Sequence, residues 1–176
     1  MGKILQIAQL GHPILQERAE EVTDIFDPSI QSLIDDMLTT TADSNGVGLA
    51  APQVYELKRI IIVSSHPNAR YPYAPKMEPT AMINPVITWE SDEQNKEWEG
   101  CLSIPGIRGM VPRSTKIRIK YLDRDSHEIE TEYADFIARV VQHECDHLNG
   151  ISFLERVENP KELASEKEFL KSIAKR

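Results

Sequence analysis

The spacing of apolar residues changes along the chain from a helical period to a strand period and back, and this pattern constrains the fold most strongly. Near the start, apolar residues follow the i, i+3, i+4, i+7, i+8 stripe of a core-facing helix: Ile30, Leu33, Ile34, Met37 and Leu38. Asp27-Pro28 supplies an N-cap and a first-turn proline, and turn residues follow at 43–46. We therefore expect the first helix between these two signals.

The middle of the chain shows the patterns of β-strands. The short β-branched run at 59–64 predicts a buried strand, and 81–90 predicts a second strand interrupted at Pro85. Apolar and charged residues then alternate over 116–121, as in a half-buried strand, and a turn leads into 127–133. These two segments predict a β-hairpin.

Helical signals return toward the end of the chain. A helix is expected from about Asp135 to Leu148, where Asn149-Gly150 ends it, and a last helix is expected to begin at Asn159-Pro160. That last helix would carry three apolar residues on one side: Leu163, Leu170 and Ala174. Residues 66–80 contain four prolines and are expected to form an exposed loop.

These patterns favour an α+β fold, with antiparallel or mixed sheets packed around the helix at 135–148 and one helix near each end of the chain. The chain shows no internal repeat and no long linker. We therefore expect a single domain over residues 1–176, in which 158–176 form a helical tail.

Composition limits the class of function. The 176 residues include 20 Lys plus Arg against 28 Asp plus Glu, a formal charge of -8, which argues against nucleic-acid binding because phosphate contacts need a basic surface. No apolar run approaches the roughly 18 residues of a membrane span, and the start lacks the pattern of a signal peptide. Two cysteines are too few for a disulfide framework. We therefore expect a cytoplasmic protein without a membrane role.

The strongest chemical signal is His143-Glu144-Cys145-Asp146-His147, an H-E-x-x-H motif on a predicted helix. At i and i+4 the two imidazoles leave one face of the helix and can grip one metal ion. Glu144 leaves the helix about 100° away, where it can act as a base on metal-bound water. The spacing therefore predicts a catalytic metal site.

Two histidines leave a tetrahedral ion short of a protein ligand. Cys145 lies on the opposite side of the predicted helix and is expected to fill space in the core. Cys101 lies in the segment 99–103, beside a glycine that permits close backbone approach, but an ordinary buried thiol would explain it as well. These residues alone leave the third ligand open.

The segment 46–53, Gly-Val-Gly-Leu-Ala-Ala-Pro-Gln, is rich in small residues and free of charge. It lacks the Lys-Ser/Thr ending of a P-loop and the third glycine of a dinucleotide fingerprint. Small residues there would let the backbone approach a ligand or another strand, and Gln53 would present an amide to a developing oxyanion. Tight packing alone is the alternative interpretation.

Taken together, the three segments resemble the peptide deformylases, whose pattern is G-x-G-L-A-A-P-Q, E-G-C-L-S and Q-H-E-x-D-H in this order. Residues 46–53, 99–103 and 142–147 supply these letters without a mismatch. The chain departs from the family in a longer proline-rich stretch at 66–80 and in lacking Arg-Leu-Arg after the His-Pro pair. The similarity spans most of the chain and implies a deformylase catalytic domain.

The resemblance implies a metallo-amidohydrolase that removes the formyl group from the N-terminal formyl-methionine of new polypeptides and releases formate. Cys101, His143 and His147 would hold Fe²⁺, with Zn²⁺, Ni²⁺ or Co²⁺ as substitutes. Glu144 would take a proton from the metal-bound water and return it to the leaving amine. The Gln53 amide and the Leu102 backbone N–H would bind the oxyanion, with the metal.

The resemblance also implies a substrate site. Backbone of Val47, Gly48 and Gly100 would pair with the peptide. An apolar pocket for methionine would be lined or bordered by Val47, Phe136, Val140 and the His143 ring. Two arginines have implied places near this site: Arg108 lies near the peptide or at the rim, and Arg139 lies at the pocket mouth or on the surface. Glu99 and Arg113 would form a buried pair that supports the Cys101 segment. Asp146 would support a metal ligand or cap the helix.

Two other classes remain as alternatives. The H-E-x-x-H motif also occurs in metallopeptidases, but these enzymes usually have a carboxylate or a histidine as the third metal ligand rather than a cysteine. A silent ribosome-docking or metal-storing protein would need neither Glu144 nor Gln53. The expected partners are therefore nascent formyl-methionyl peptides, with a transient ribosome contact as a further candidate.

Overall fold

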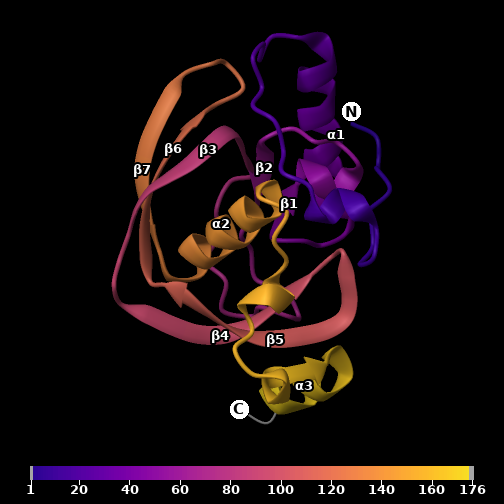
Figure 1. Cartoon of the computed structure of the whole chain (residues 1–176), viewed down its shortest axis with the longest axis vertical. Helices are drawn as coiled ribbons and strands as arrows, with labels where there is room; N and C mark the ends of the chain where they lie inside the picture. The colour runs from indigo at the N-terminus through magenta and orange to yellow at the C-terminus, as the bar shows by residue number, and fades with distance from the viewer. Residues whose placement is uncertain (1, 175–176) are drawn as a thin grey trace.

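The computed structural model describes residues 2–174, which form two antiparallel sheets and three α-helices (Figure 1). The larger sheet has the strand order β1-β2-β3-β6-β7. Its strands are β1 (Gly48–Ala50), β2 (Ile60–Val63), β3 (Thr80–Glu90), β6 (Lys116–Leu122) and β7 (Glu128–Ala134). The predicted buried strand is β2, and the predicted hairpin is β6–β7.

The interruption predicted at Pro85 appears in β3 as an irregularity of the strand pairing. The strand continues past it, but its register against β6 shifts between Ile83 and Val86. A proline has no N–H to donate to a ladder, so an irregularity at this point accommodates it.

The smaller sheet has the order β4-β5-β8, with β4 at Gln94–Cys101, β5 at Ile104–Ser114 and β8 at Leu163–Ser165. The hairpin between β4 and β5 turns at residues 102–103, and Cys101 is opposite Ile104. The second sequence motif, residues 99–103, thus ends β4 and forms the turn into β5.

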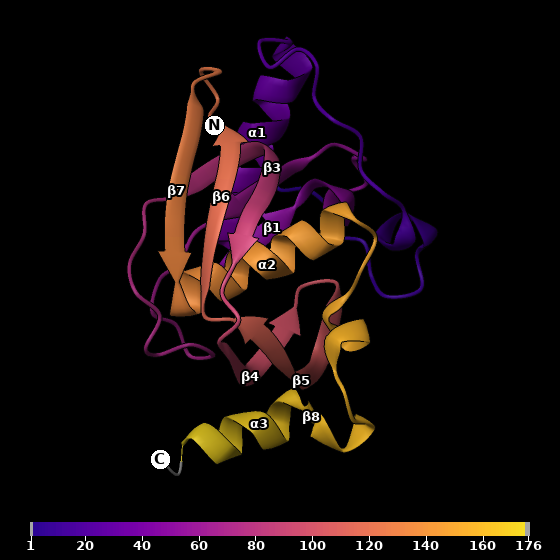
Figure 2. The same ribbon diagram turned by 60° about the vertical axis from the view of Figure 1, so that its left-hand side comes forward.

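Helix α2 (Asp135–Leu148) begins and ends as predicted and crosses between the two sheets (Figure 2). It contacts β1, β2, β6 and β7 of the larger sheet and β5 of the smaller one. Its residues Ala138, Val141 and Leu148 are fully buried in a cluster with the larger sheet. Both sheets therefore hold the helix that carries the H-E-x-x-H motif.

Helix α1 (Pro28–Asp43) covers the other side of β1 and β2, where Ile34 and Met37 are fully buried against Leu49 and Ile60. The Asp27 side chain accepts a hydrogen bond from the backbone N–H of Ser29, as the predicted N-cap requires.

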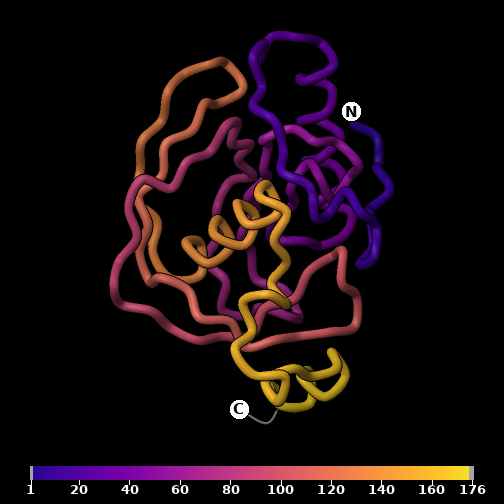
Figure 3. Tube along the Cα trace, viewed as in Figure 1, coloured from indigo at the N-terminus to yellow at the C-terminus, as the bar shows by residue number. Residues whose placement is uncertain are grey.

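The N-terminal trace runs beside α1 along the outside of the molecule (Figure 3). Ala8 N donates to Gln53 O and Leu10 N donates to Ser103 O. This segment therefore ties together the backbones of the first and second motifs.

The prediction of one helix from Asn159-Pro160 onward is wrong. Asn159 caps only a three-residue 3₁₀ turn (Pro160–Glu162), and Leu163 belongs to β8, which pairs with residues 107–109 of β5. The α-helix α3 (Glu166–Ile173) begins later, where the Ser165 side chain accepts from the Glu168 backbone N–H. Residues 175–176 of the predicted tail lie outside the described part of the chain.

The α+β class predicted from the sequence is confirmed. Within residues 2–174, no helix has both the length and the apolar character needed to cross a bilayer.

Candidate metal centre and active site

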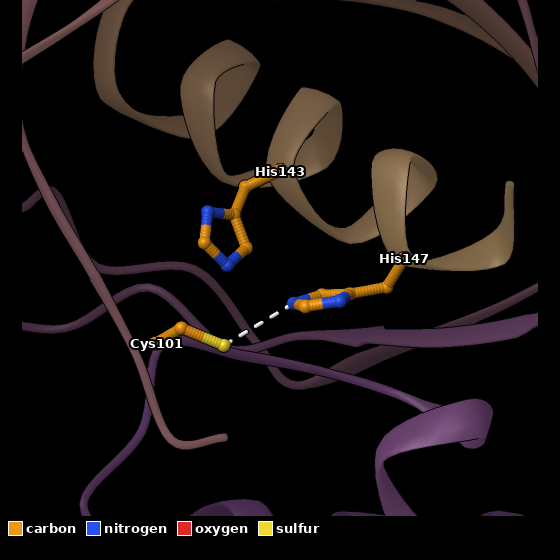
Figure 4. A group of neighbouring side chains, drawn as sticks. All are labelled: Cys101, His143 and His147. Atoms are coloured by element: carbon orange, nitrogen blue, oxygen red, sulfur yellow. Dashed lines mark hydrogen bonds between the residues drawn. The ribbon is translucent and has the colours of Figure 1, made fainter. Parts of the chain in front are cut away.

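Three potential metal ligands, Cys101, His143 and His147, lie side by side (Figure 4). The Cys101 Sγ lies at the end of β4, and His143 and His147 project from α2 one turn apart. Their ligand atoms all lie within 4.8 Å of one another, and Cys101 Sγ is 3.2 Å from His147 Nε2. One thiolate and two imidazoles are a donor set that suits a tetrahedral divalent ion with a fourth position open.

The surroundings favour the thiolate form of Cys101. Burial disfavours ionisation, but the charge of His147 and hydrogen bonds from both histidines outweigh it and hold the pKa of the thiol well below its ordinary value. A deprotonated sulfur is the form that binds a metal. The residues present therefore fit an ion at this place.

Glu99, on β4 two residues before Cys101, orients the first histidine. Its Oε2 lies 2.9 Å from His143 Nδ1, which leaves Nε2 as the ring nitrogen free for a metal. Burial opposes the charge on Glu99, but the hydrogen bond to His143 and the charge of Arg113 keep the pKa of this carboxyl well below its usual range. Glu99 is thus a buried anion that fixes the imidazole.

Two buried arginines hold Glu99 in turn. Arg113 on β5 contacts Glu99 Oε1 at 2.9 Å and Asp146 Oδ2 at 2.6 Å, while Arg139 on α2 contacts Glu99 Oε1 at 2.8 Å. Arg156 closes the network with a 2.6 Å contact to Asp146 Oδ1. These ion pairs join α2 to the β4–β5 hairpin. Removal of any one of these side chains would leave a buried charge unpaired, so the network disfavours movement of the helix away from the hairpin.

Glu144 is buried beside the metal ligands. Its Oε2 is a buried oxygen without a hydrogen-bond partner among residues 2–174. Burial raises the pKa of Glu144 to about 7, against the opposing charges of His143 and His147. A carboxyl group with this pKa can take up and release a proton near neutral pH.

The first motif approaches Glu144 closely at Gly48. A Cβ atom at residue 48 would overlap the Glu144 carboxylate, with the Cγ and Cδ atoms at 2.9 and 2.8 Å. The strand β1 therefore needs a glycine at this position for Glu144 to keep its place.

Gln53 lies in the turn after β1 and faces the cysteine. Its Nε2 donates to Cys101 Sγ at 3.3 Å and to Ser103 Oγ at 3.1 Å, and its Oε1 accepts from the Ala50 N–H at 2.8 Å. The amide thus lies beside the ligand cluster.

A pocket opens at this cluster. Its lining comes from the first motif, the proline-rich loop, the β4–β5 hairpin and α2, and includes Val47, Gln53, Tyr71, Trp98, Gly100, Leu102, Arg108, Phe136, Val140, His143 and Glu144. Glycines, apolar side chains and a potential metal site therefore share one cavity.

Comparison with known proteins decides the family. A sequence profile described as polypeptide deformylase matches residues 4–163. The chain belongs to this family. Peptide deformylase 2 of Nostoc sp. is 50% identical over 173 residues, which cover 98% of this chain and 97% of the relative.

Solved deformylase structures share the fold. A class I type b peptide deformylase from Acinetobacter baumannii with Met-Ala-Ser bound has a TM-score of 0.87 and 46% identity, covering 89% of this chain and 100% of that chain. Peptide deformylase from Thermotoga maritima has a TM-score of 0.80 and 35% identity, covering 89% and 99% of the two chains. The chain is thus a metal-dependent hydrolase that removes the N-formyl group from nascent peptides.

The structure brings the residues singled out by the deformylase resemblance into one place. The predicted catalytic and substrate-binding residues all line the pocket, as do two of the three predicted ligands, Cys101 and His143. The predicted Glu99–Arg113 pair is present. Asp146 makes ion pairs rather than a helix cap, and Arg139 is buried in the same network, not on the surface.

Sequence reasoning missed three residues that line the deformylase pocket: Arg70, Tyr71 and Trp98. The first two come from the loop at 66–80, whose prolines gave no sign that it folds over the site. Trp98 lies on the same face of β4 as Gly100, but the mostly polar sequence of this strand gave no local signal for it.

Proposed function

We propose that Cys101, His143 and His147 hold one ferrous ion and that Glu144 carries the proton during hydrolysis of the formyl group. The observation that carries this proposal is the buried, unpartnered Glu144 Oε2 next to three convergent soft and borderline donors. A bound divalent ion would act as a Lewis acid and lower the pKa of a water molecule. Zn²⁺, Ni²⁺ or Co²⁺ would serve as substitutes, since the donor set suits each of them.

Glu144 performs the proton transfer. Its carboxylate takes a proton from the attacking water at Oε2 and delivers it to the methionine nitrogen as the C–N bond of the formamide breaks. A pKa of about 7 supports both steps, because the group is neither strongly acidic nor permanently protonated at neutral pH.

Gln53 and Leu102 stabilise the oxyanion that develops on the formyl oxygen. The Gln53 amide, which donates to Cys101 Sγ and Ser103 Oγ, would turn one N–H toward that oxygen, and the Leu102 backbone N–H would supply a second donor. A formyl carbon bears only hydrogen, so a narrow site can exclude larger acyl groups by steric contact.

The peptide binds as an added strand. Backbone groups of Val47 and Gly48 on one side and Gly100 on the other provide a sequence-tolerant edge for a nascent chain. The methionine side chain packs on Val47, Phe136 and Val140, and Arg108 borders the peptide.

We further infer that residues 1–176 act as one catalytic domain in the cytoplasm, where nascent formyl-peptides arise. A transient contact with the ribosome would bring the enzyme to its substrate. The reducing cytosol also suits the site, because ferrous iron and a thiolate are both sensitive to oxidation.

The test is a metal and activity measurement on protein purified without oxygen. Wild type should contain about one iron per chain and release formate from formyl-Met-Ala-Ser, whereas E144Q should keep its metal and lose turnover by about a thousandfold. E97Q makes the same substitution on an exposed β4 side chain and should retain activity. Full turnover in E144Q would contradict the assigned proton carrier.

A further inference from the structure

The C-terminal helix contacts the wall of the catalytic pocket through one buried arginine. Arg108 on β5 has a side chain only 5% exposed, and its Nη2 lies 2.6 Å from Glu166 Oε1 at the start of α3. Its Nη1 donates to the Tyr71 hydroxyl at 2.9 Å. Arg108 therefore joins the C-terminal helix to the loop that covers the pocket.

Aromatic rings enclose the same guanidinium. Its central carbon lies 5.6 Å from the centre of the Tyr71 ring and 5.3 Å from that of Phe169 on α3, within the range of cation–π attraction. Phe169 is 4% exposed and also packs against Trp98, at 5.7 Å between ring centres. Two residues of α3 thus hold Arg108, and one of them also supports a pocket residue.

On its inner side, the Arg108 guanidinium packs against Gly100. A Cβ atom at residue 100 would overlap the guanidinium, with Nε at 2.7 Å. Gly100 immediately precedes Cys101 on β4, and Arg108 and Gly100 both line the catalytic pocket. The position of this side chain therefore determines the shape of the wall against which a substrate strand would lie.

We propose that α3 is part of the substrate-binding apparatus, with Glu166 as a positioning residue that holds Arg108 against Gly100 and Tyr71. This inference rests on the proposed peptide site at Gly100 and Arg108. Among residues 2–174, Glu166 supplies the one carboxylate paired with this buried guanidinium. Without that charge, Arg108 turns toward solvent and Tyr71 loses its hydrogen-bonded anchor.

The helix itself offers a matched control. Glu168 lies two residues further along α3, and its carboxylate pairs with Lys171 on the exposed side of the helix. E166Q and E168Q therefore make the same substitution on one helix, facing the pocket wall in one case and solvent in the other.

The experiment measures kcat and KM separately for formyl-Met-Ala-Ser with metal-loaded full-length protein. We expect E166Q to raise KM about tenfold with kcat within twofold of wild type, because the binding wall changes while the metal ligands and Glu144 do not. E166D, which restores the charge, should recover most of the KM, and E168Q should match wild type. F169L should also raise KM, which provides a second variant with the charge intact.

A double-mutant cycle tests the route of the effect. If Glu166 acts through Arg108, E166Q adds nothing to the KM of R108A. An unchanged KM in E166Q and F169L, or an effect of E166Q that persists in full in R108A, would overturn the inference while leaving the deformylase mechanism intact. Absence of formate release from wild type would instead refute the proposed function.

Discussion

The two cysteines of the chain have opposite chemical environments. The charge of His147 and hydrogen bonds from both histidines lower the pKa of the Cys101 thiol despite its burial, whereas burial raises the pKa of Cys145 to about 12. Cys145 packs in the core between α2 and the larger sheet. One thiol is thus prepared to ionise and bind a metal, and the other is kept neutral.

This difference predicts the outcome of exchanging each cysteine for alanine. C101A should lose stoichiometric metal and activity together, while C145A should keep both, with some loss of thermal stability from the missing core sulfur. Metal content by elemental analysis and formate release measure the two effects. A C101A protein that retains one tightly bound ion per chain would refute the ligand set.

Gly48 allows a second test at the scale of one residue. A methyl group there would displace the Glu144 carboxylate, so G48A should reduce kcat by about a hundredfold or more while the three metal ligands keep their ion. Gly46 provides the control, because a Cβ there meets first the flexible end of Leu102, at 3.2 Å. Activity of G48A equal to that of G46A would show that Glu144 does not need its observed place.

At the scale of elements, local sequence signals predicted the helices α1 and α2 and the hairpin β6–β7. Each of these has a period and a boundary signal within its own residues, such as the Asp27 cap and the Asn149-Gly150 stop. The H-E-x-x-H geometry followed from α2 alone. Elements whose structure is determined by their own residues and their neighbours in the sequence could therefore be predicted.

The smaller sheet depends on partners distant in the sequence and was not predicted. Strand β4 is mostly polar, and β5 contains two prolines and two glycines, which is typical of a loop. Leu163 fitted a helical stripe, yet pairing of β8 with β5 overrides that preference. The ionic network of Glu99 and the loop contact of Tyr71 require this sheet, so they could not be foreseen in full.

At the scale of the whole molecule, the larger sheet and α2 share a core that contains a pair of tyrosines. Tyr121 is 7% exposed in that core, and the half-buried Tyr133 packs against it. Burial, with a hydrogen bond to Tyr121, raises the pKa of Tyr133 above its ordinary value. The native state therefore favours the neutral phenol more than the unfolded chain does.

The sign of the resulting pH dependence follows from linkage. Below the unfolded pKa of about 10, Tyr133 is neutral in both states and its contribution to stability is constant. As pH rises above about 10, the unfolded chain loses its proton first, so stability falls, by at most about 1.4 kcal/mol per pH unit and by less for a half-exposed ring. The protein should thus become easier to unfold at alkaline pH.

Urea unfolding of metal-loaded wild type and Y133F from pH 8 to pH 11 isolates this contribution. The phenylalanine variant keeps the ring in the core but has no proton to release, so the other tyrosines and the lysines cancel in the comparison. The difference in unfolding free energy between the two proteins should be constant to about pH 10 and then shift in favour of Y133F. A difference that stays constant to pH 11 would mean that Tyr133 is as free to ionise in the folded protein as in the unfolded chain, and that the packing of β6 and β7 against α2 does not protect it.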